Sequence, residues 1–218
     1  MTVSTKKLLS YVVPLVLEEG KTKLGQTYEV NFENGVKVLN SANTNYSFGS
    51  LHQIMLKGIE EVLRKHQPKK VLMLGLGAGS ALSVLNKKCQ WSFNVTAVEL
   101  DSDLIRIAEE HFDLKNYSNL NMINGDAAEQ VKLLPAASFD FIIDDVFMDD
   151  TVPAFCRETS YIEACRRLLE SGGIYMRNVM ANGFEHMKLY EEELKNNFKD
   201  VYSLKHKTYG NRIFFCKA

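Results

Sequence analysis

A glycine-rich loop is the first feature of this chain with the residue types and spacing for chemistry. It reads Gly75-Leu76-Gly77-Ala78-Gly79 and separates a short apolar run from a helical segment. Glycines let the backbone turn tightly and approach a ligand closely, and a helix that starts behind them points its N-terminus at that ligand. A dinucleotide-binding loop would carry its third glycine or alanine at position 80, where this chain has Ser80. The spacing favours a nucleoside without a pyrophosphate; the alternative is a tight turn between a strand and a helix.

Two acidic residues follow the next two expected strands. Glu99 ends the first of these strands, and an acid about 20 residues beyond such a loop accepts hydrogen bonds from ribose hydroxyls. Asp126 follows the second strand, where it has two compatible roles: accepting a hydrogen bond from an adenine amino group, or capping the helix that begins at Ala127. We count Leu100 and Ala127, which adjoin these acids, with the nucleoside-binding residues.

A further strand ends on two adjacent acids, Asp144 and Asp145. Alternation along a strand puts their side chains on opposite faces, so we expect one of them, Asp145, to face the ligand. A carboxylate there would attract a sulfonium charge or accept a proton from an attacking amine. Asp149 and Asp150 extend the acidity into the following loop. The pattern favours a cationic small-molecule substrate, and a solvated acidic loop is the alternative.

Strand and helix patterns alternate from Lys70 onward, which predicts an α/β fold with a parallel sheet covered by helices on both faces. The expected strands are 71–74, 94–100, 120–124, 139–144, 173–178, 200–207 and 212–216, and the expected helices are 81–88, 103–112, 127–134, 160–170 and 184–198. The last two strands form a hairpin, which must insert one antiparallel strand into the sheet. This doubly wound, Rossmann-like arrangement is typical of the class I methyltransferase fold.

The chain before Lys70 has a different pattern. Two alternating runs within 27–40 flank Asn34-Gly35, a strong hairpin signal, and a helix is expected over 50–65. The apolar run at 8–17 is interpreted as an edge strand or docking segment. We therefore expect a short N-terminal β-hairpin region over 1–48 and the nucleoside-binding domain over 49–218.

Bulk composition excludes several classes of function. The 218 residues carry a formal net charge of −1, so no basic excess marks a nucleic-acid surface. The apolar runs are too short to span a membrane. The four cysteines are scattered and form no Cys-x-x-Cys pair, so we expect reduced thiols, no metal and a cytoplasmic location.

Together these residues resemble the spermidine synthase (polyamine aminopropyltransferase) branch of the class I methyltransferase fold, over roughly residues 28–216. Beyond the glycine loop, the segment from Phe139 to Asp145 is similar to the family's fourth strand. The segments 153–165 and 168–173 resemble the helix and glycine turn that follow it in the family.

The resemblance implies roles for particular residues. Gly75, Gly77, Gly79, Glu99 and Asp126 would bind S-adenosylmethionine or its decarboxylated form as co-substrate, and Asp145 would be the general base on an amine. His52 and Asp149 match substrate-binding positions. Ala78 departs from the pattern, because the synthases have at this position an aspartate that contacts the amine of the aminopropyl group.

These observations predict a spermidine synthase-like transferase that moves a methyl or aminopropyl group to a small amine nucleophile. The alternative is a non-catalytic nucleoside-binding or scaffold protein on the same fold. The apolar faces of the 50–65 helix and of the N-terminal hairpin look larger than one small domain needs, so we also expect a homodimer paired through this region.

Overall fold

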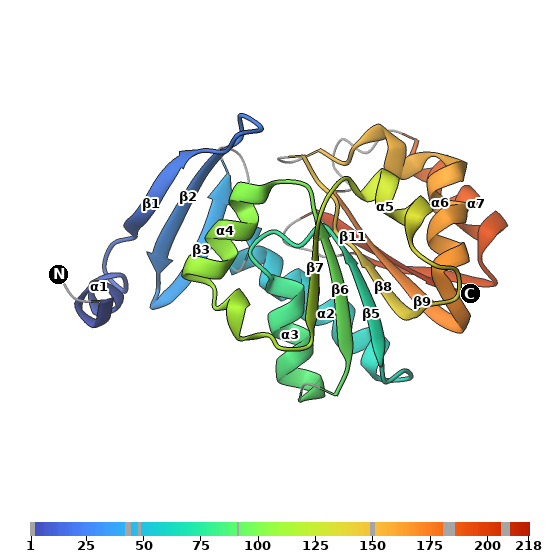
Figure 1. Ribbon diagram of the computed structural model, residues 1–218, viewed down its shortest axis with the longest axis horizontal. Coiled ribbons are helices and arrows are strands. Elements are labelled where there is room, and N and C mark those ends of the chain that lie inside the picture. Colours follow the sequence, from blue (N-terminus) through green and yellow to red (C-terminus); the bar gives the residue numbers. More distant parts are fainter. Residues whose placement is uncertain are drawn as a thin grey trace.

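The computed structural model describes residues 3–41, 45–47, 49–90, 92–148, 151–180, 186–205 and 210–218. They form two sheets (Figure 1). A small antiparallel sheet lies at the N-terminal end of the molecule, and a seven-stranded sheet covered by helices forms the rest.

The large sheet has the strand order β10-β11-β9-β8-β5-β6-β7. Its strands are β5 (Lys70–Leu74), β6 (Asn94–Glu99), β7 (Leu120–Asn124), β8 (Phe139–Asp144), β9 (Leu169–Met180), β10 (Asp200–Lys205) and β11 (Asn211–Lys217). Strands β5 to β9 pair in parallel, whereas β11 runs antiparallel between β9 and β10. The predicted parallel sheet with one inserted antiparallel strand is confirmed.

Helices cover both faces of this sheet (Figure 1). They are α2 (Gly49–Leu63), α3 (Ser80–Cys89), α4 (Ser102–His111), α5 (Ala127–Leu133), α6 (Thr159–Leu168) and α7 (Met187–Asn197), with 3-10 turns at Leu114–Asn116 and Ala154–Arg157. One apolar core lies under α2, α3 and α4, and a second lies under α5, α6 and α7. The two cores hold β5 and β8 in the middle of the sheet, so the carboxyl ends of these strands are firmly placed.

The N-terminal sheet is larger than the predicted hairpin. It has four strands, β1 (Leu15–Lys21), β2 (Thr27–Glu33), β3 (Val36–Ser41) and β4 (Asn45–Ser47), preceded by the helix α1 (Val3–Leu9). The β2–β3 hairpin turns at Asn34-Gly35 as predicted, with φ of 50° and 77°. The edge strand expected over 8–17 is only partly confirmed, because Leu8 and Leu9 end α1 and the edge strand β1 begins at Leu15. Strand β4 was not predicted, because three residues are too few to show a periodic pattern. This strand is defined only by its pairing with β3.

The expectation of a free apolar face on the helix after this sheet is wrong. Ile54, Met55 and Ile59 of α2 are almost fully buried in the core that α2 shares with α3 and the sheet. The exposed apolar side chains gather instead near the N-terminus, around Leu8 and Val12.

Candidate active site

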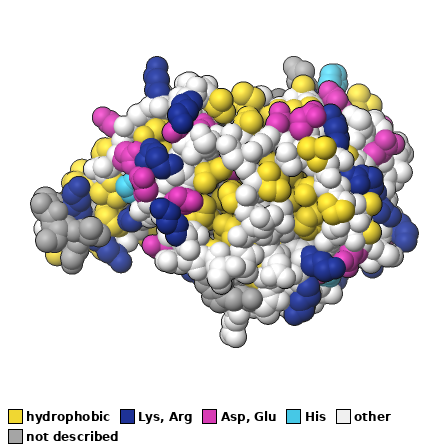
Figure 2. Space-filling view, in the orientation of Figure 1, with side chains coloured by type: hydrophobic (Ala, Val, Ile, Leu, Met, Phe, Trp, Pro, Cys, Tyr) yellow, Lys and Arg dark blue, Asp and Glu magenta, His cyan; other side chains and the backbone are white. Residues whose placement is uncertain are grey.

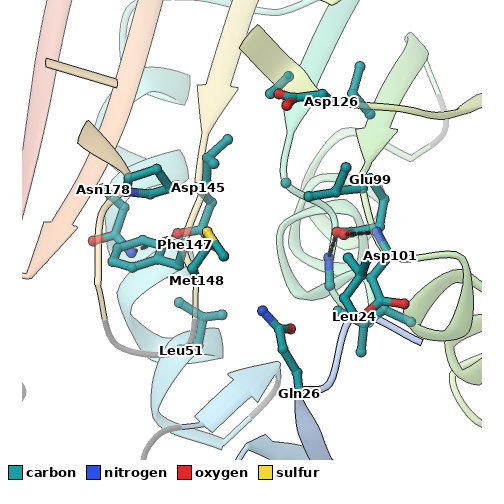
Figure 3. A pocket seen from close by; sticks show the side chains of 18 of the residues that line it. Leu24, Gln26, Leu51, Glu99, Asp101, Asp126, Asp145, Phe147, Met148 and Asn178 are labelled. Atoms are coloured by element: carbon teal, nitrogen blue, oxygen red, sulfur yellow. Dashed lines mark hydrogen bonds between the residues drawn. The ribbon is translucent and has the colours of Figure 1, made fainter. Parts of the chain in front are cut away.

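A cavity of about 340 Å³ lies at the carboxyl ends of β5, β6, β7 and β8. Ligands of doubly wound sheets bind outside these strand ends, and the volume is in the range of small-molecule sites. Its lining includes Leu24, Gln26, Leu51, Ile54, Gly75, Gly77, Glu99, Leu100, Asp101, Asp126, Ala127, Asp145, Phe147, Met148, Asn178, Met180 and Asn211. Glu99 lies on one side of the cavity and Asp145 on the opposite side (Figure 3).

The glycine loop contributes to the lining of this cavity. Gly75 and Gly77 line the cavity. Gly79, also predicted to bind the nucleoside, is not among the lining residues and precedes α3 as its N-cap, with φ of 88°. Gly75 also has a positive φ, 78°, and a Cβ at this position would lie 2.6 Å from the backbone oxygen of Asp145. Glycine is therefore required at position 75 for two reasons: its backbone has a positive φ, and the loop that follows β8 (the β8 loop, from Asp145 on) passes close to it.

Glu99 is tied to the glycine loop by backbone hydrogen bonds. Its Oε2 accepts from the N–H groups of Leu76 and Gly77, at 3.0 and 2.9 Å, and its Oε1 accepts from Asp101 at 3.0 Å. Burial raises the pKa of Glu99, and these hydrogen bonds act in the opposite direction. A carboxylate offers about four acceptor positions, so Glu99 keeps about one for a ligand hydroxyl. Sequence reasoning missed this structural role, and ribose binding stays a prediction.

Asp126 caps α5, because its side chain accepts a hydrogen bond from the backbone N–H of Ala128 at 2.8 Å. The predicted cap is confirmed. The side chain also lines the cavity together with Ala127 and Leu100, so the adenine-binding role stays open as a prediction.

Asp145 follows the end of β8 and is half-buried in the cavity wall. Its Oδ1 accepts a hydrogen bond from Nδ2 of Asn178 at 2.8 Å. Burial raises the pKa of Asp145 to about 7, although the hydrogen bond from Asn178 and the charge of Arg177 both lower it. A pKa in this range suits a carboxyl group that accepts a proton near neutral pH. The role of Asp145 as general base stays a prediction.

Asp144 points to the opposite side of β8 and is fully buried. It forms an ion pair with Arg177, which is equally buried, and its Oδ2 accepts hydrogen bonds from the hydroxyls of Tyr161 and Tyr175 at 3.0 and 2.6 Å. Nη2 of Arg177 also donates to the backbone oxygen of Val146 at 3.3 Å. This network anchors the loop that follows β8 on the side away from the cavity. The two adjacent acids therefore have different environments, as the alternation predicted.

The N-terminal sheet completes the cavity. The turn between β1 and β2 contributes Leu24 and Gln26, whose side chains reach the side opposite Asp126 (Figure 3). The backbone N–H of Lys23 donates to Oδ2 of Asp103 at 2.8 Å, which links this turn to α4. No local pattern in the sequence indicated these residues, because the contact depends on how the two sheets meet.

An ionic cluster joins the N-terminal sheet to α4. Glu18 of β1 accepts hydrogen bonds from Arg106 at 2.8 Å and Tyr28 at 2.7 Å, and it contacts Nε2 of His111 at 2.6 Å. Hydrogen bonding to Arg106 is the main reason that the pKa of Glu18 falls to about 2. One possible metal-ligating atom from each of Glu18, Glu110 and His111 lies within 4.8 Å of the other two. In this structure both carboxylates form ion pairs with Arg106.

Neither of the two predicted substrate-binding residues, His52 and Asp149, is among the described residues that line this cavity. His52 lies on α2, where burial and the charge of Lys87 on α3 lower its pKa, and it is not among the lining residues. Asp149 lies outside the described residues. Phe147, Met148 and Leu51 do line the cavity, within the two segments, 147–158 and 43–52, expected to form the acceptor pocket. Asn178 and Asn211 were missed, although a polar residue at a strand end is a recognisable signal.

The strand order, the reversed β11 and the glycine loop before α3 define the class I methyltransferase fold. Residues 65–214 match the family model described as a methyltransferase domain. The chain therefore belongs to the methyltransferase domain family, and within it the chain is a spermidine synthase-like member. Its domain falls in the class of S-adenosylmethionine-dependent transferases, either methyltransferases or aminopropyltransferases.

Curated relatives come from both of these groups. The chain is 30% identical over 153 residues to the polyamine aminopropyltransferase of Vibrio vulnificus, a match that covers 67% of this chain and 50% of that protein. It is 26% identical over 180 residues to the eEF1A lysine and N-terminal methyltransferase of Danio rerio, covering 76% of this chain and 26% of that protein. The chain thus spans half or less of the length of these relatives.

Solved structures share the fold. A probable spermidine synthase from Corynebacterium glutamicum superposes with a TM-score of 0.76 at 20% identity, covering 92% of this chain and 79% of that one. A spermidine synthase in complex with the transition-state analogue AdoDATO gives a TM-score of 0.72, also at 20% identity, over 93% and 73% of the two chains.

Two further observations concern the surface charge and the length of the helices. Lysine and arginine side chains are interspersed with aspartate and glutamate on the face in Figure 2, without a patch of one sign. Among the described residues, every helix is too short or too polar to cross a bilayer.

Proposed function

We propose that the protein transfers the methyl group of S-adenosylmethionine to the nitrogen of an amine, with Asp145 as the general base. The observation that carries this proposal is the position of Asp145, on the cavity wall opposite Glu99, with its pKa raised to about 7 by burial. The names of the relatives also refer to amines: polyamines in one case, lysine and protein N-termini in the other.

The chemistry needs alignment and one proton acceptor. An amine arrives as an ammonium ion at neutral pH, and its proton passes to the ionised carboxylate of Asp145. The freed nitrogen lone pair then attacks the methyl carbon. The carbon–sulfur bond breaks and its electron pair stays on sulfur. The products are the methylated amine, which carries the positive charge as an ammonium ion, and the neutral thioether S-adenosylhomocysteine. Asp145 then releases its proton to solvent. A base with a pKa near the working pH suits this transfer.

The donor is held in this proposal by the glycine loop and the two acids beyond it. Gly75 and Gly77 allow close approach, Glu99 accepts a ribose hydroxyl with its remaining capacity, and Asp126 with Leu100 faces the adenine. The cavity volume of about 340 Å³ is compatible with a nucleoside and part of an acceptor.

Ala78 favours S-adenosylmethionine over its decarboxylated form. An aminopropyl donor ends in an ammonium group, and the resemblance assigns an aspartate at this position to that group. Here the residue is alanine, 1% exposed, packed against the N-terminal sheet, and its N–H donates to Oγ of Ser47 at 2.8 Å. Without a carboxylate at position 78, the amino acid end of S-adenosylmethionine, which carries a carboxylate of its own, meets less repulsion.

Calorimetry with the two nucleosides tests the donor. We expect S-adenosylmethionine to bind at least about tenfold more tightly than decarboxylated S-adenosylmethionine, which corresponds to about 1.4 kcal/mol. Tighter binding of the decarboxylated form would favour aminopropyl transfer, the second candidate, which the 30% identical relative supports. Binding of neither nucleoside would refute both candidates.

Transfer itself is tested with methyl-labelled S-adenosylmethionine and a panel of monoamines, putrescine, spermidine and lysine peptides. We expect Asp145→Asn to lower the rate constant at least about 100-fold while leaving donor binding nearly unchanged. Tight donor binding without transfer to any amine would support the non-catalytic alternative.

A further inference from the structure

We propose that Asn178 and Asn211 act as a positioning pair that holds one carboxylate oxygen of Asp145 and leaves the other for the proton of the substrate. This inference rests on the proposed role of Asp145 as the base. Neither asparagine is expected to touch the reacting atoms; both act through the carboxylate.

A chain of two hydrogen bonds connects the three side chains. Nδ2 of Asn211 donates to Oδ1 of Asn178 at 3.0 Å, and Nδ2 of Asn178 donates to Oδ1 of Asp145 at 2.8 Å. Both amides are nearly inaccessible, with exposures of 1% for Asn178 and 5% for Asn211. Hydrogen bonds in such dry surroundings are stronger than at the surface, and a buried amide left without them is costly. The described residues give the other oxygen of Asp145, Oδ2, no hydrogen bond.

Asn211 fixes which way the side-chain amide of Asn178 is oriented. An amide presents an oxygen on one side and an NH₂ group on the other, and rotation by a half-turn exchanges them. Because Asn211 donates to the oxygen of Asn178, the NH₂ group of Asn178 faces Asp145. The reversed orientation would place an amide oxygen against a carboxylate oxygen, two acceptors in contact.

The inserted strand β11 is what brings Asn211 to this place. In the antiparallel register of β9 and β11, Asn178 lies opposite Ile213, and Asn211 lies two residues before Ile213, at the start of β11. Residues two apart in a strand share a face, so the two asparagines are diagonal neighbours on the cavity side. Both line the cavity (Asn178 and Asp145 are labelled in Figure 3).

The hydrogen bond from Asn178 also helps to set the charge state of the base. The charged groups around Asp145 are Arg177 on β9, which lowers its pKa, and Asp144 on β8 and Glu99 on β6, which raise it. The amide of Asn178 favours the ionised form, because it donates to the carboxylate. Its removal should therefore raise the pH at which Asp145 ionises.

Carboxyl-carbon NMR titration of the whole chain without ligands measures this effect, with Asp145→Asn identifying the resonance. We expect Asn178→Ala to raise the titration midpoint of Asp145 by about one pH unit, and Asn211→Ala to raise it by about half as much. Since Asn211 acts through Asn178, adding Asn211→Ala to Asn178→Ala should cause no further shift. Asn197→Ala, which removes an amide bonded to Glu193 on α7, should leave the midpoint unchanged.

Three outcomes would overturn the positioning pair: an unmoved midpoint in Asn178→Ala, an unmoved midpoint in Asn211→Ala, or an equal shift from Asn211→Ala in both backgrounds. If urea titrations show that Asn178→Ala does not fold, the Asn211→Ala variant alone still tests the positioning pair, because this variant keeps the contact between Asn178 and Asp145. Calorimetry with S-adenosylmethionine separates the two proposals. A wild type that binds no donor refutes the proposed function, whereas donor binding with unmoved midpoints refutes the positioning pair.

Discussion

The two adjacent acids at the end of β8 lie in two different environments. Asp144 is fully buried and is compensated by Arg177 and two tyrosine hydroxyls. Asp145 has one amide donor and an open cavity, and burial raises its pKa to about 7. Asp144 therefore has a structural role, whereas Asp145 lines the cavity and is the acid to which the proposed function assigns the proton transfer.

The raised pKa of Asp145 should make the wild type less stable as the pH rises. An unfolded aspartate ionises near pH 4, so between about pH 4 and 7 the native state binds more protons than the unfolded state. The stabilising contribution of the protonated form is present below pH 4 and is lost as the pH rises through 7. We expect Asp145→Asn, which keeps an acceptor for Asn178, to be more stable than the wild type by about 2 to 4 kcal/mol at pH 8 and similar to it at pH 4. Urea unfolding at the two pH values measures this difference; equal stabilities at pH 8 would contradict it.

Gly75 offers a second test at the residue scale. Gly75→Ala should destabilise the protein by about 1 to 3 kcal/mol and weaken binding of S-adenosylmethionine at least tenfold, because the added Cβ meets the backbone of Asp145 and displaces the β8 loop. Gly172→Ala is the matched control, since Gly172 has a similar φ of 80° with no atom within 4 Å of the added Cβ. If both variants bind the donor equally well, the close approach at Gly75 has no role in the site.

At the scale of elements, the site is shared between two sheets. Strands of the large sheet supply Glu99, Asp145 and Asn178, and the β1–β2 turn of the N-terminal sheet supplies Leu24 and Gln26. Contacts between Glu18 and α4, and between Lys37 and the backbone oxygen of His111, attach the small sheet beside the cavity. The position of the turn thus depends on α4, which also follows the Glu99 loop.

Loss of the ionic cluster should therefore affect ligand affinity more than stability. We expect Arg106→Met to weaken binding of S-adenosylmethionine about three- to tenfold, because the turn with Leu24 and Gln26 is held less firmly. The cost in stability should stay below about 1 kcal/mol, since Arg106 is partly exposed. Calorimetry and urea unfolding measure the two effects.

Arg64→Met provides the control for this variant. The exposed side chain of Arg64, just after α2, forms an ion pair with Glu61 of α2, and neither residue lines the cavity. Its removal should leave donor affinity unchanged. An equal loss of affinity in both variants would show a general electrostatic effect in place of a local one.

At the scale of the whole molecule, the exposed apolar side chains concentrate at the N-terminus. Leu8 is 72% exposed and Val12 is 87% exposed, and Tyr11, Val13 and Val16 are exposed as well. Large apolar patches on a surface mark interaction sites. The dimer predicted from the sequence stays a prediction. We now expect its contact at this N-terminal cluster and not at α2.

Light scattering after size exclusion tests this prediction. We expect a dimer for the wild type and a monomer for Leu8→Glu combined with Val12→Glu, with little change in stability because both side chains are exposed. Leu133→Glu, at an equally exposed position on α5, should remain dimeric. A monomeric wild type would contradict the prediction.

The sequence alone determined the main fold and part of the candidate site. Alternating periodicity, the glycine loop and the terminal hairpin are local signals, so they predicted the parallel sheet, the reversed strand and the placement of Glu99, Asp126 and Asp145 at strand ends. The opposite orientations of Asp144 and Asp145 followed from the two-residue period of a strand.

The tertiary structure alone decided the contacts between segments far apart in the chain. The hydrogen bonds of Glu99 to the glycine loop, the reach of Gln26 into the cavity and the chain from Asn211 to Asp145 join residues that no local pattern relates. The same limit explains the N-terminal sheet, whose short β4 exists only through pairing with β3. Periodicity reports which face of an element is buried, but which partner covers that face depends on the packing of the whole chain.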